Sequence, residues 1–118
     1  MAPPLDSLTE FDVTIGLEQA DNDEELYLEV LAMFHDQLQN EFQDLPEHLG
    51  QPDDSLARKV HTLKGSASSV GANRIALAAT DIDQTLKRGD AVDTAQSEAL
   101  RDALQAGLRQ LHSVVQVQ

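Results

Sequence analysis

The apolar residues of this chain recur every three or four positions over long stretches, which is the period of an amphipathic helix. Polar residues fill the opposite face, and short runs with proline, glycine or aspartate separate one stretch from the next. No convincing stretch alternates strictly between apolar and polar residues, as a half-buried strand would. The pattern therefore predicts an all-α protein whose helices are joined by short turns.

The first half of the chain predicts a short helix followed by a long one. The short helix covers about residues 14–20. The long helix is expected to begin at Asn22, whose side chain can cap it, while Glu25 completes a capping-box pattern. Pro46 lacks a backbone donor and is expected to bend or end this helix. Its apolar stripe consists of Tyr27, Leu31, Phe34, Leu38 and Phe42.

Three more helices are predicted in the second half. Pro52 suits the first turn of a helix, and Gly71 can stop that helix in a left-handed conformation. Asn73 is placed to cap the next helix, which should end near Gly89. Asp93, followed three residues later by a glutamine, can cap the last one. Four long amphipathic helices with short connections predict an antiparallel up-down four-helix bundle, with a short extra N-terminal helix.

A length of 118 residues fits one domain with a modest core. Residues 1–9 contain two prolines and few apolar anchors, so we expect a disordered lead-in there and the helical domain over residues 10–118. No apolar run approaches the ~20 residues of a membrane span, and the N-terminus lacks the features of a signal peptide. The chain has no cysteine. These features predict a soluble, cytoplasmic protein without direct membrane contact, and we expect it to be a monomer.

The formal net charge of −13 makes nucleic acid a poor candidate partner, because nucleic-acid binding needs a basic surface. The charge is also unevenly distributed. Residues 1–54 contain 15 of the 21 acidic residues and no lysine or arginine, while all eight basic residues lie in residues 55–118. This imbalance fits a solvated acidic face that keeps the protein soluble, or a locally basic site in an acidic molecule.

The third long stretch carries a histidine opposite its apolar stripe. Each residue turns a helix by ~100°, which places the centre of that stripe roughly 140° from His61. Lys64 lies about 60° from His61, Gly65 about 40° and Ser68 about 20°, all on the outer face. Glycine inside a helix costs ~1 kcal/mol relative to alanine. Space for another molecule to approach the imidazole would account for Gly65.

This outer face suits phosphoryl transfer. A neutral imidazole nitrogen is a good nucleophile near pH 7. The reaction needs in-line access and a cation near the phosphoryl oxygens, which Lys64 can supply, and Ser68 adds a hydroxyl donor. The sequence has no Gly-rich phosphate loop for ATP and no carboxylate cluster around His61 for Mg²⁺. Taken by itself, however, His61 is most simply an ordinary surface histidine, and only Lys64 and Gly65 at this spacing make a functional role as well favoured as that interpretation.

Metal binding is not expected elsewhere in the chain. None of the other histidines makes an i, i+4 ligand pair with another histidine or an acid in a plausible metal motif. These histidines are His35, His48 and His112. The sequence therefore predicts no metal site and no cofactor in this chain.

The segment His-Thr-Leu-Lys-Gly-Ser-Ala at residues 61–67, followed by Val-Gly-Ala at residues 70–72, resembles the signature of histidine-containing phosphotransfer (HPt) domains. Two further regions are similar to the start of the family's second helix and to the turn before its last helix. They are residues 16–34 and residues 86–90. The resemblance covers about residues 11–115, nearly the whole domain.

The resemblance implies a four-helix bundle that displays a phosphorylated histidine on one helix. It implies that His61 is the phosphoacceptor, that Lys64 is the charge partner of the phosphoryl group, and that Gly65 admits a receiver domain. In many relatives a polar side chain of the next helix contacts the other ring nitrogen, and this position falls on Asp83. Glutamine or glutamate is common there. The shorter Asp83 either orients the imidazole or lies as a solvated acid on the helix edge.

The resemblance thus implies a histidine phosphocarrier of a two-component phosphorelay rather than an ATP-using kinase. It would take a phosphoryl group from a receiver-domain aspartate and pass it to, or back from, another receiver. The implied partners are response-regulator receiver domains and a hybrid sensor histidine kinase, with Mg²⁺ on the receiver. Two alternatives stay open. One is the dimerising segment of a histidine kinase, which usually has an acid where this chain has Thr62. The other is a docking module with a vestigial, unphosphorylated histidine.

Overall fold

The computed structural model describes residues 8–50 and 53–115. Every regular element within these residues is helical, which confirms the all-α fold expected from the periodicity. The elements are α1 (Val13–Gln19), α2 (Glu24–Gln37), the π-helical segment η2 (Leu38–Phe42), α3 (Leu45–His48), α4 (Asp54–Val70), α5 (Asn73–Lys87) and α6 (Thr94–Val115).

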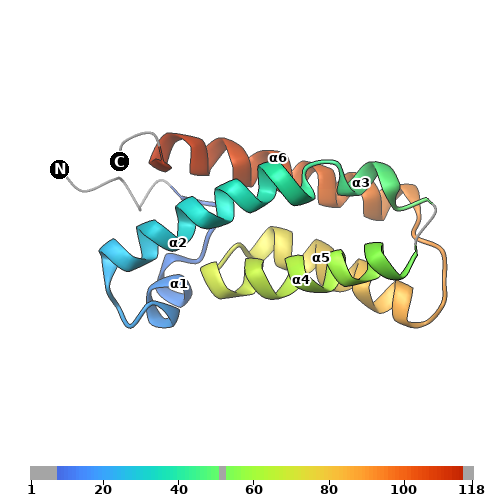
Figure 1. Ribbon diagram of the computed structural model, residues 1–118, viewed down its shortest axis with the longest axis horizontal. Helices are drawn as coiled ribbons and strands as arrows, with labels where there is room; N and C mark the ends of the chain where they lie inside the picture. Colours follow the sequence, from blue (N-terminus) through green and yellow to red (C-terminus); the bar gives the residue numbers. More distant parts are fainter. Residues whose placement is uncertain (1–7, 51–52, 116–118) are drawn as a thin grey trace.

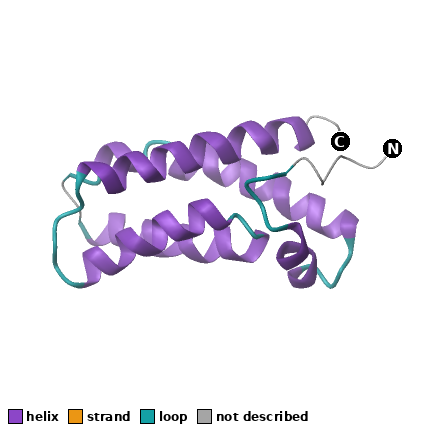
Figure 2. Cartoon of the chain, turned by 180° about the vertical axis from the view of Figure 1, so that it is seen from behind, coloured by secondary structure: helices purple, strands orange, loops and turns teal. Residues whose placement is uncertain are grey.

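The long helices form an antiparallel bundle whose extents are 47 × 23 × 21 Å. Helix α2, continued by η2 and α3, lies along α6, while α4 and α5 lie together on the other side (Figure 1). Successive long helices run in opposite directions, so the predicted up-down topology is confirmed. The short α1 packs against α4 and α2 at one end of the bundle (Figure 2). No helix among the described residues is long and apolar enough to cross a membrane.

The predicted apolar stripes face the centre of the bundle. The five stripe residues of the second predicted helix are all at most 2% exposed. Burying such side chains stabilises the fold by about 1.5–3 kcal/mol each. Tyr27, the only tyrosine of the chain, donates its hydroxyl to the carbonyl of Val70 at 2.8 Å. Burial, with a smaller contribution from the charge of Asp12, raises the pKa of Tyr27 to about 12.

The described chain is folded from Leu8 onward, two residues before the expected domain boundary. Leu8 is 3% exposed. Gln110 of α6 accepts a hydrogen bond from the Glu10 backbone at 2.9 Å and donates one to the Thr9 hydroxyl at 2.7 Å. The remainder of the expected lead-in, residues 1–7, lies outside the described residues.

Two predicted helix caps are wrong. Asp23, not Asn22, caps α2, because its carboxylate accepts the Leu26 N–H at 3.1 Å from an extended backbone. Asn22 lies in the preceding turn with a positive φ of 58°. At the start of α5, Asn73 is already a helical residue, and the residue before it is Ala72, which has no side chain able to cap.

Other helix ends agree with the sequence. Asp93 and Gln96 form the predicted capping box, with reciprocal backbone-to-side-chain bonds of 2.8 and 3.0 Å. Gly71 ends α4 in the left-handed region, with φ of 77°. Pro52 lies outside the described residues, and the carboxylate of Asp53 caps α4.

The second long helix changes its winding before Pro46 is reached. Helix α2 passes at Leu38 into a π-helical segment, and Pro46 lies at the start of the short α3. The expected bend or end at the proline is therefore replaced by a change of helix type and a turn upstream of it. A π-helical segment contains more residues per turn than an α-helix. Leu38 and Phe42 at its two ends both stay buried.

Candidate functional site

The apolar face of α4 determines where its histidine points. The five inward residues are at most 7% exposed and lie against the rest of the bundle. They are Leu56, Val60, Leu63, Ala67 and Val70. His61 lies on the opposite face, as the helical period predicts, and its side chain is 63% exposed. Packing of the core therefore holds an imidazole at the surface.

Asp83 brings a carboxylate from α5 to the base of this imidazole. The whole residue is only 4% exposed, because α4 and α5 pack closely along their length. Its Oδ1 lies 3.8 Å from Nδ1 of His61. Its Oδ2 accepts a hydrogen bond from Nζ of Lys64 at 2.9 Å and lies 3.0 Å from Nζ of Lys87. Asp83 is thus a buried, paired carboxylate and not the solvated helix-edge acid that the sequence left open.

Two lysines keep Asp83 ionised. Burial by itself disfavours the charged form and raises the pKa of the carboxyl. Hydrogen bonds from Lys64 and Lys87, together with the attraction of their positive charges, outweigh burial and hold the pKa of Asp83 below its ordinary value. The carboxylate is therefore an anion at neutral pH, with two cations on one of its oxygens.

The position of Asp83 distinguishes the two nitrogens of His61. At 3.8 Å, Oδ1 is beyond hydrogen-bond distance, so the shorter side chain indeed does not reach the ring. It is still the nearest negative charge, and it favours a proton on Nδ1. A neutral imidazole with its proton on Nδ1 carries a free lone pair on Nε2, on the far side of the ring. The arrangement can present Nε2 as a nucleophile.

The three residues expected to act beside His61 on α4 differ in what their side chains contact. A Cβ added to Gly65 would meet nothing within 4 Å, so packing within this chain does not require glycine there. Ser68 donates its hydroxyl to the carbonyl of Lys64 at 2.9 Å, and so its proton is directed along its own helix. Lys64, expected to face a phosphoryl group, is paired with Asp83.

Lys87 is the site residue that sequence reasoning missed. In the sequence it stands in residues 86–90, the segment similar to the family's turn before its last helix. It follows Asp83 by four residues, a spacing that places the two side chains on one face of α5. This i, i+4 acid–lysine pair is the signal that could have found it. Its side chain is 62% exposed, so it reaches the buried carboxylate from the solvent side.

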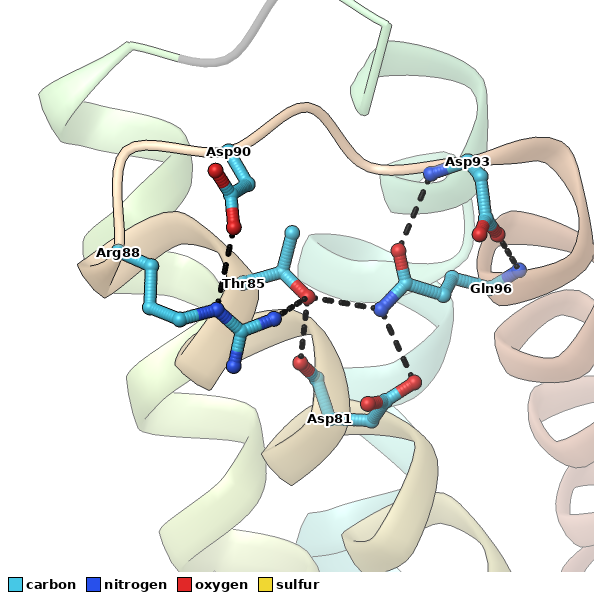
Figure 3. A network of polar contacts seen from close by, with 6 residues as sticks. All are labelled: Asp81, Thr85, Arg88, Asp90, Asp93 and Gln96. Atoms are coloured by element: carbon cyan, nitrogen blue, oxygen red, sulfur yellow. Dashed lines mark hydrogen bonds and ion pairs between the residues drawn. The ribbon is translucent and has the colours of Figure 1, made fainter.

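A polar network joins the last turns of α5 to the α5–α6 loop and to the start of α6 (Figure 3). Arg88 donates to the Asp90 carboxylate at 3.1 Å and to the Thr85 hydroxyl at 3.4 Å. Gln96 of α6 donates to the same hydroxyl at 2.8 Å. Of the two neighbouring basic residues, Arg88 is therefore engaged by the α5–α6 loop, and Lys87 pairs with the site carboxylate.

Two of the other histidines contact each other on α2 and α6, the helices on the other side of the bundle. His35 of α2 is buried and stacks on His112 of α6, with ring centroids 6.0 Å apart. Nδ1 of His35 is buried without a hydrogen-bond partner. His48 is exposed at the end of α3. Among residues 8–50 and 53–115, no group of three or more histidine, aspartate or glutamate side chains is arranged to hold a metal ion.

Comparison with known proteins places the chain in a family. The family model of the Hpt domain matches residues 29–114, which include every residue of the site described above. A solved structure, the HPT domain of a sensor hybrid histidine kinase from Shewanella, has the same fold, with a TM-score of 0.80. The two are 24% identical, and the match covers 92% of this chain and 96% of that chain. Comparison with curated proteins gives no match.

The chain therefore belongs to the Hpt domain family. Domains of this family are phosphotransfer modules of two-component phosphorelays and are not kinases. The general role of the chain is thus phosphotransfer, and the resemblance noted at residues 61–72 is confirmed at the level of the family.

Proposed function

We propose that this chain is a cytoplasmic phosphocarrier that accepts a phosphoryl group on His61 from the phosphoaspartate of a receiver domain. It then passes the group to another receiver domain, or back. Its partners are response-regulator receiver domains, including the receiver of a hybrid sensor histidine kinase. One observation carries the proposal. An exposed imidazole has a buried, ionised carboxylate, Asp83, on its Nδ1 side, which leaves Nε2 free.

In the forward step, the Nε2 lone pair of His61 attacks the phosphorus of the receiver's aspartyl phosphate. A P–N bond forms, the P–O bond to the receiver aspartate breaks, and its electron pair stays with that carboxylate. The proton on Nδ1 remains in place, so the ring becomes cationic. Asp83 stabilises this charge, as a carboxylate does beside a catalytic imidazole. The reverse step exchanges the same bonds with the next receiver.

In the transition state, a nearby cation must stabilise the negative charge on the phosphoryl oxygens. Lys64 follows His61 by three residues, a spacing that makes the two side chains neighbours on the surface of α4. The Mg²⁺ of the reaction is expected on the receiver, and this chain contributes no cofactor. Gly65 leaves room beside the imidazole for the receiver to bring its phosphoaspartate in line with Nε2.

The proposal is tested with the full chain and a receiver domain phosphorylated by acetyl phosphate. Mass spectrometry at neutral pH should find a single phosphopeptide containing His61, and brief acid treatment should remove the phosphate. His61→Gln should abolish labelling and leave the melting temperature nearly unchanged, because the side chain is largely exposed. His48→Gln replaces another exposed histidine and is the matched control, with labelling unchanged.

ATP with Mg²⁺ and no other protein should not label the chain, since the sequence contains no phosphate-binding loop. Stoichiometric labelling by ATP alone would favour the kinase alternative. A wild-type chain that stays unlabelled by phosphorylated receivers would favour the docking module.

A further inference from the structure

We infer that Lys87 is a positioning residue that holds the Asp83 carboxylate while Lys64 turns to the phosphoryl group on His61. The inference rests on the proposed function and goes beyond it, because it gives the two lysines different tasks. Lys64 is the cation that moves to the transferred group. Lys87 is the cation that stays with Asp83.

The placement of the two lysines separates these tasks. Both Nζ atoms pair with the same oxygen of Asp83, Lys64 at 2.9 Å and Lys87 at 3.0 Å. Lys64 is on α4, three residues after His61, so its flexible side chain can reach either the carboxylate or a group on the imidazole. Lys87 is on α5, four residues after Asp83, so the side chain next to it on the surface of that helix is the carboxylate of Asp83.

The charge of the cluster changes when His61 is phosphorylated. Before transfer, the imidazole lies beside one anion and two cations. The phosphoryl group adds about two negative charges, and the ring gains one positive charge. With both lysines present the phosphorylated cluster is close to neutral. Without Lys87 it would carry excess negative charge, and the single remaining lysine would be shared between Asp83 and the phosphoryl oxygens.

Because Asp83 is buried, its carboxylate needs a positively charged partner throughout the transfer. Its side chain is 6% exposed, so water cannot replace Lys64 as the group that neutralises it. A buried carboxylate left without a partner is strongly unfavourable. Lys87 supplies that partner from the solvent side, with 62% of its side chain exposed. Arg88 is held by Asp90 and the Thr85 hydroxyl, and so it is not positioned to take over (Figure 3).

The test measures the rate of phosphoryl transfer from a receiver domain, charged with acetyl phosphate, to the full chain. Lys87→Gln should slow transfer at least fivefold. Lys87→Arg keeps the positive charge and should stay within twofold of wild type. Arg88→Gln removes the same charge from the next residue and should also stay within twofold. Both positions are exposed, so the melting temperatures of the three variants should agree closely with wild type and show that each variant is folded.

A second set of variants asks whether Lys87 acts through Asp83. In a chain that carries Asp83→Asn, adding Lys87→Gln should slow transfer by less than twofold, because the carboxylate that needs Lys87 is gone. A full Lys87→Gln effect in that background would show direct action on the phosphoryl group or the receiver and would overturn the inference. Equal rates for Lys87→Gln and Arg88→Gln would overturn it while leaving the proposed function intact. An unlabelled wild-type chain would overturn both.

Discussion

Two glycines lie inside long helices of this bundle for opposite reasons. Gly107 of α6 is buried where α6 meets α5, and a Cβ there would lie 2.9 Å from Cδ1 of Ile75. Gly65 of α4 is exposed beside His61, and a Cβ there would meet nothing within 4 Å. Both glycines disfavour their helices by ~1 kcal/mol relative to alanine. One lets two helices approach each other, whereas the other leaves the surface next to the imidazole open to another molecule.

The largest effect is expected at the packed glycine. Gly107→Gln should lower the free energy of unfolding by about 1–3 kcal/mol despite its better helix propensity, because the new side chain must displace Ile75 or push α6 away from α5. Urea unfolding measures this change. Phosphoryl transfer by the folded protein should be unaffected. A variant as stable as wild type would show that the α5–α6 contact is loose enough to admit a side chain, and the contrast with Gly65 would disappear.

The same replacement at Gly65 should have the opposite effects, leaving stability intact and slowing phosphoryl transfer. Gly65→Gln is expected to keep or raise the melting temperature, because the helix gains a better helix former without a clash. Transfer from a phosphorylated receiver should slow at least tenfold, or ~1.4 kcal/mol in the barrier, because the side chain occupies space the receiver needs. Unchanged transfer would show that the receiver approaches from another side, and a fall in melting temperature would contradict the open surface.

A smaller effect is expected from acid, at the buried carboxylate beneath this open surface. The pKa of Asp83 is lower in the folded chain than its ordinary value, so its stabilising effect is complete above about pH 4. That effect is lost as the pH falls below this range toward the lowered pKa. The free energy of unfolding of wild type should therefore fall more steeply on acidification than that of Asp83→Asn. Parallel curves would mean that the lysines do not stabilise the charged form.

The smallest effect is expected at Ser68. Its hydroxyl donates to the carbonyl of Lys64 and not toward the imidazole. Ser68→Ala should therefore change the transfer rate by less than twofold and the stability by less than about 0.5 kcal/mol, as for most exposed positions. A tenfold slower transfer would show that the hydroxyl turns to the phosphoryl group during the reaction. The surface around His61 would then include a hydrogen-bond donor, the Ser68 hydroxyl, that is engaged by the Lys64 carbonyl in the unphosphorylated state.

Much of α4 could be predicted because its properties are local. The helical period places five apolar residues on one side and His61 on the other, and the observed burial agrees. Gly71 ends the helix as expected, since a left-handed residue is needed there. The residue that caps a helix was harder to predict where two candidate cap residues are adjacent in the sequence. Asn22 and Asp23 can both accept a backbone hydrogen bond, and the fold of the preceding turn selects Asp23.

The contacts of Asp83 with His61 and Lys64 were decided by the tertiary structure alone, whereas its i, i+4 pair with Lys87 is local to α5. The helical period of α5 assigns each residue an angle about its own axis, but it contains nothing about the distance or rotation of α4. Only the packing of the two helices brings Asp83 to 3.8 Å from His61 and lets Lys64, nineteen residues earlier, share its carboxylate with Lys87. The sequence by itself thus determined a helical bundle with an exposed histidine. The buried carboxylate meets His61 and Lys64 because the core packs α5 against α4 and so places side chains distant in sequence together.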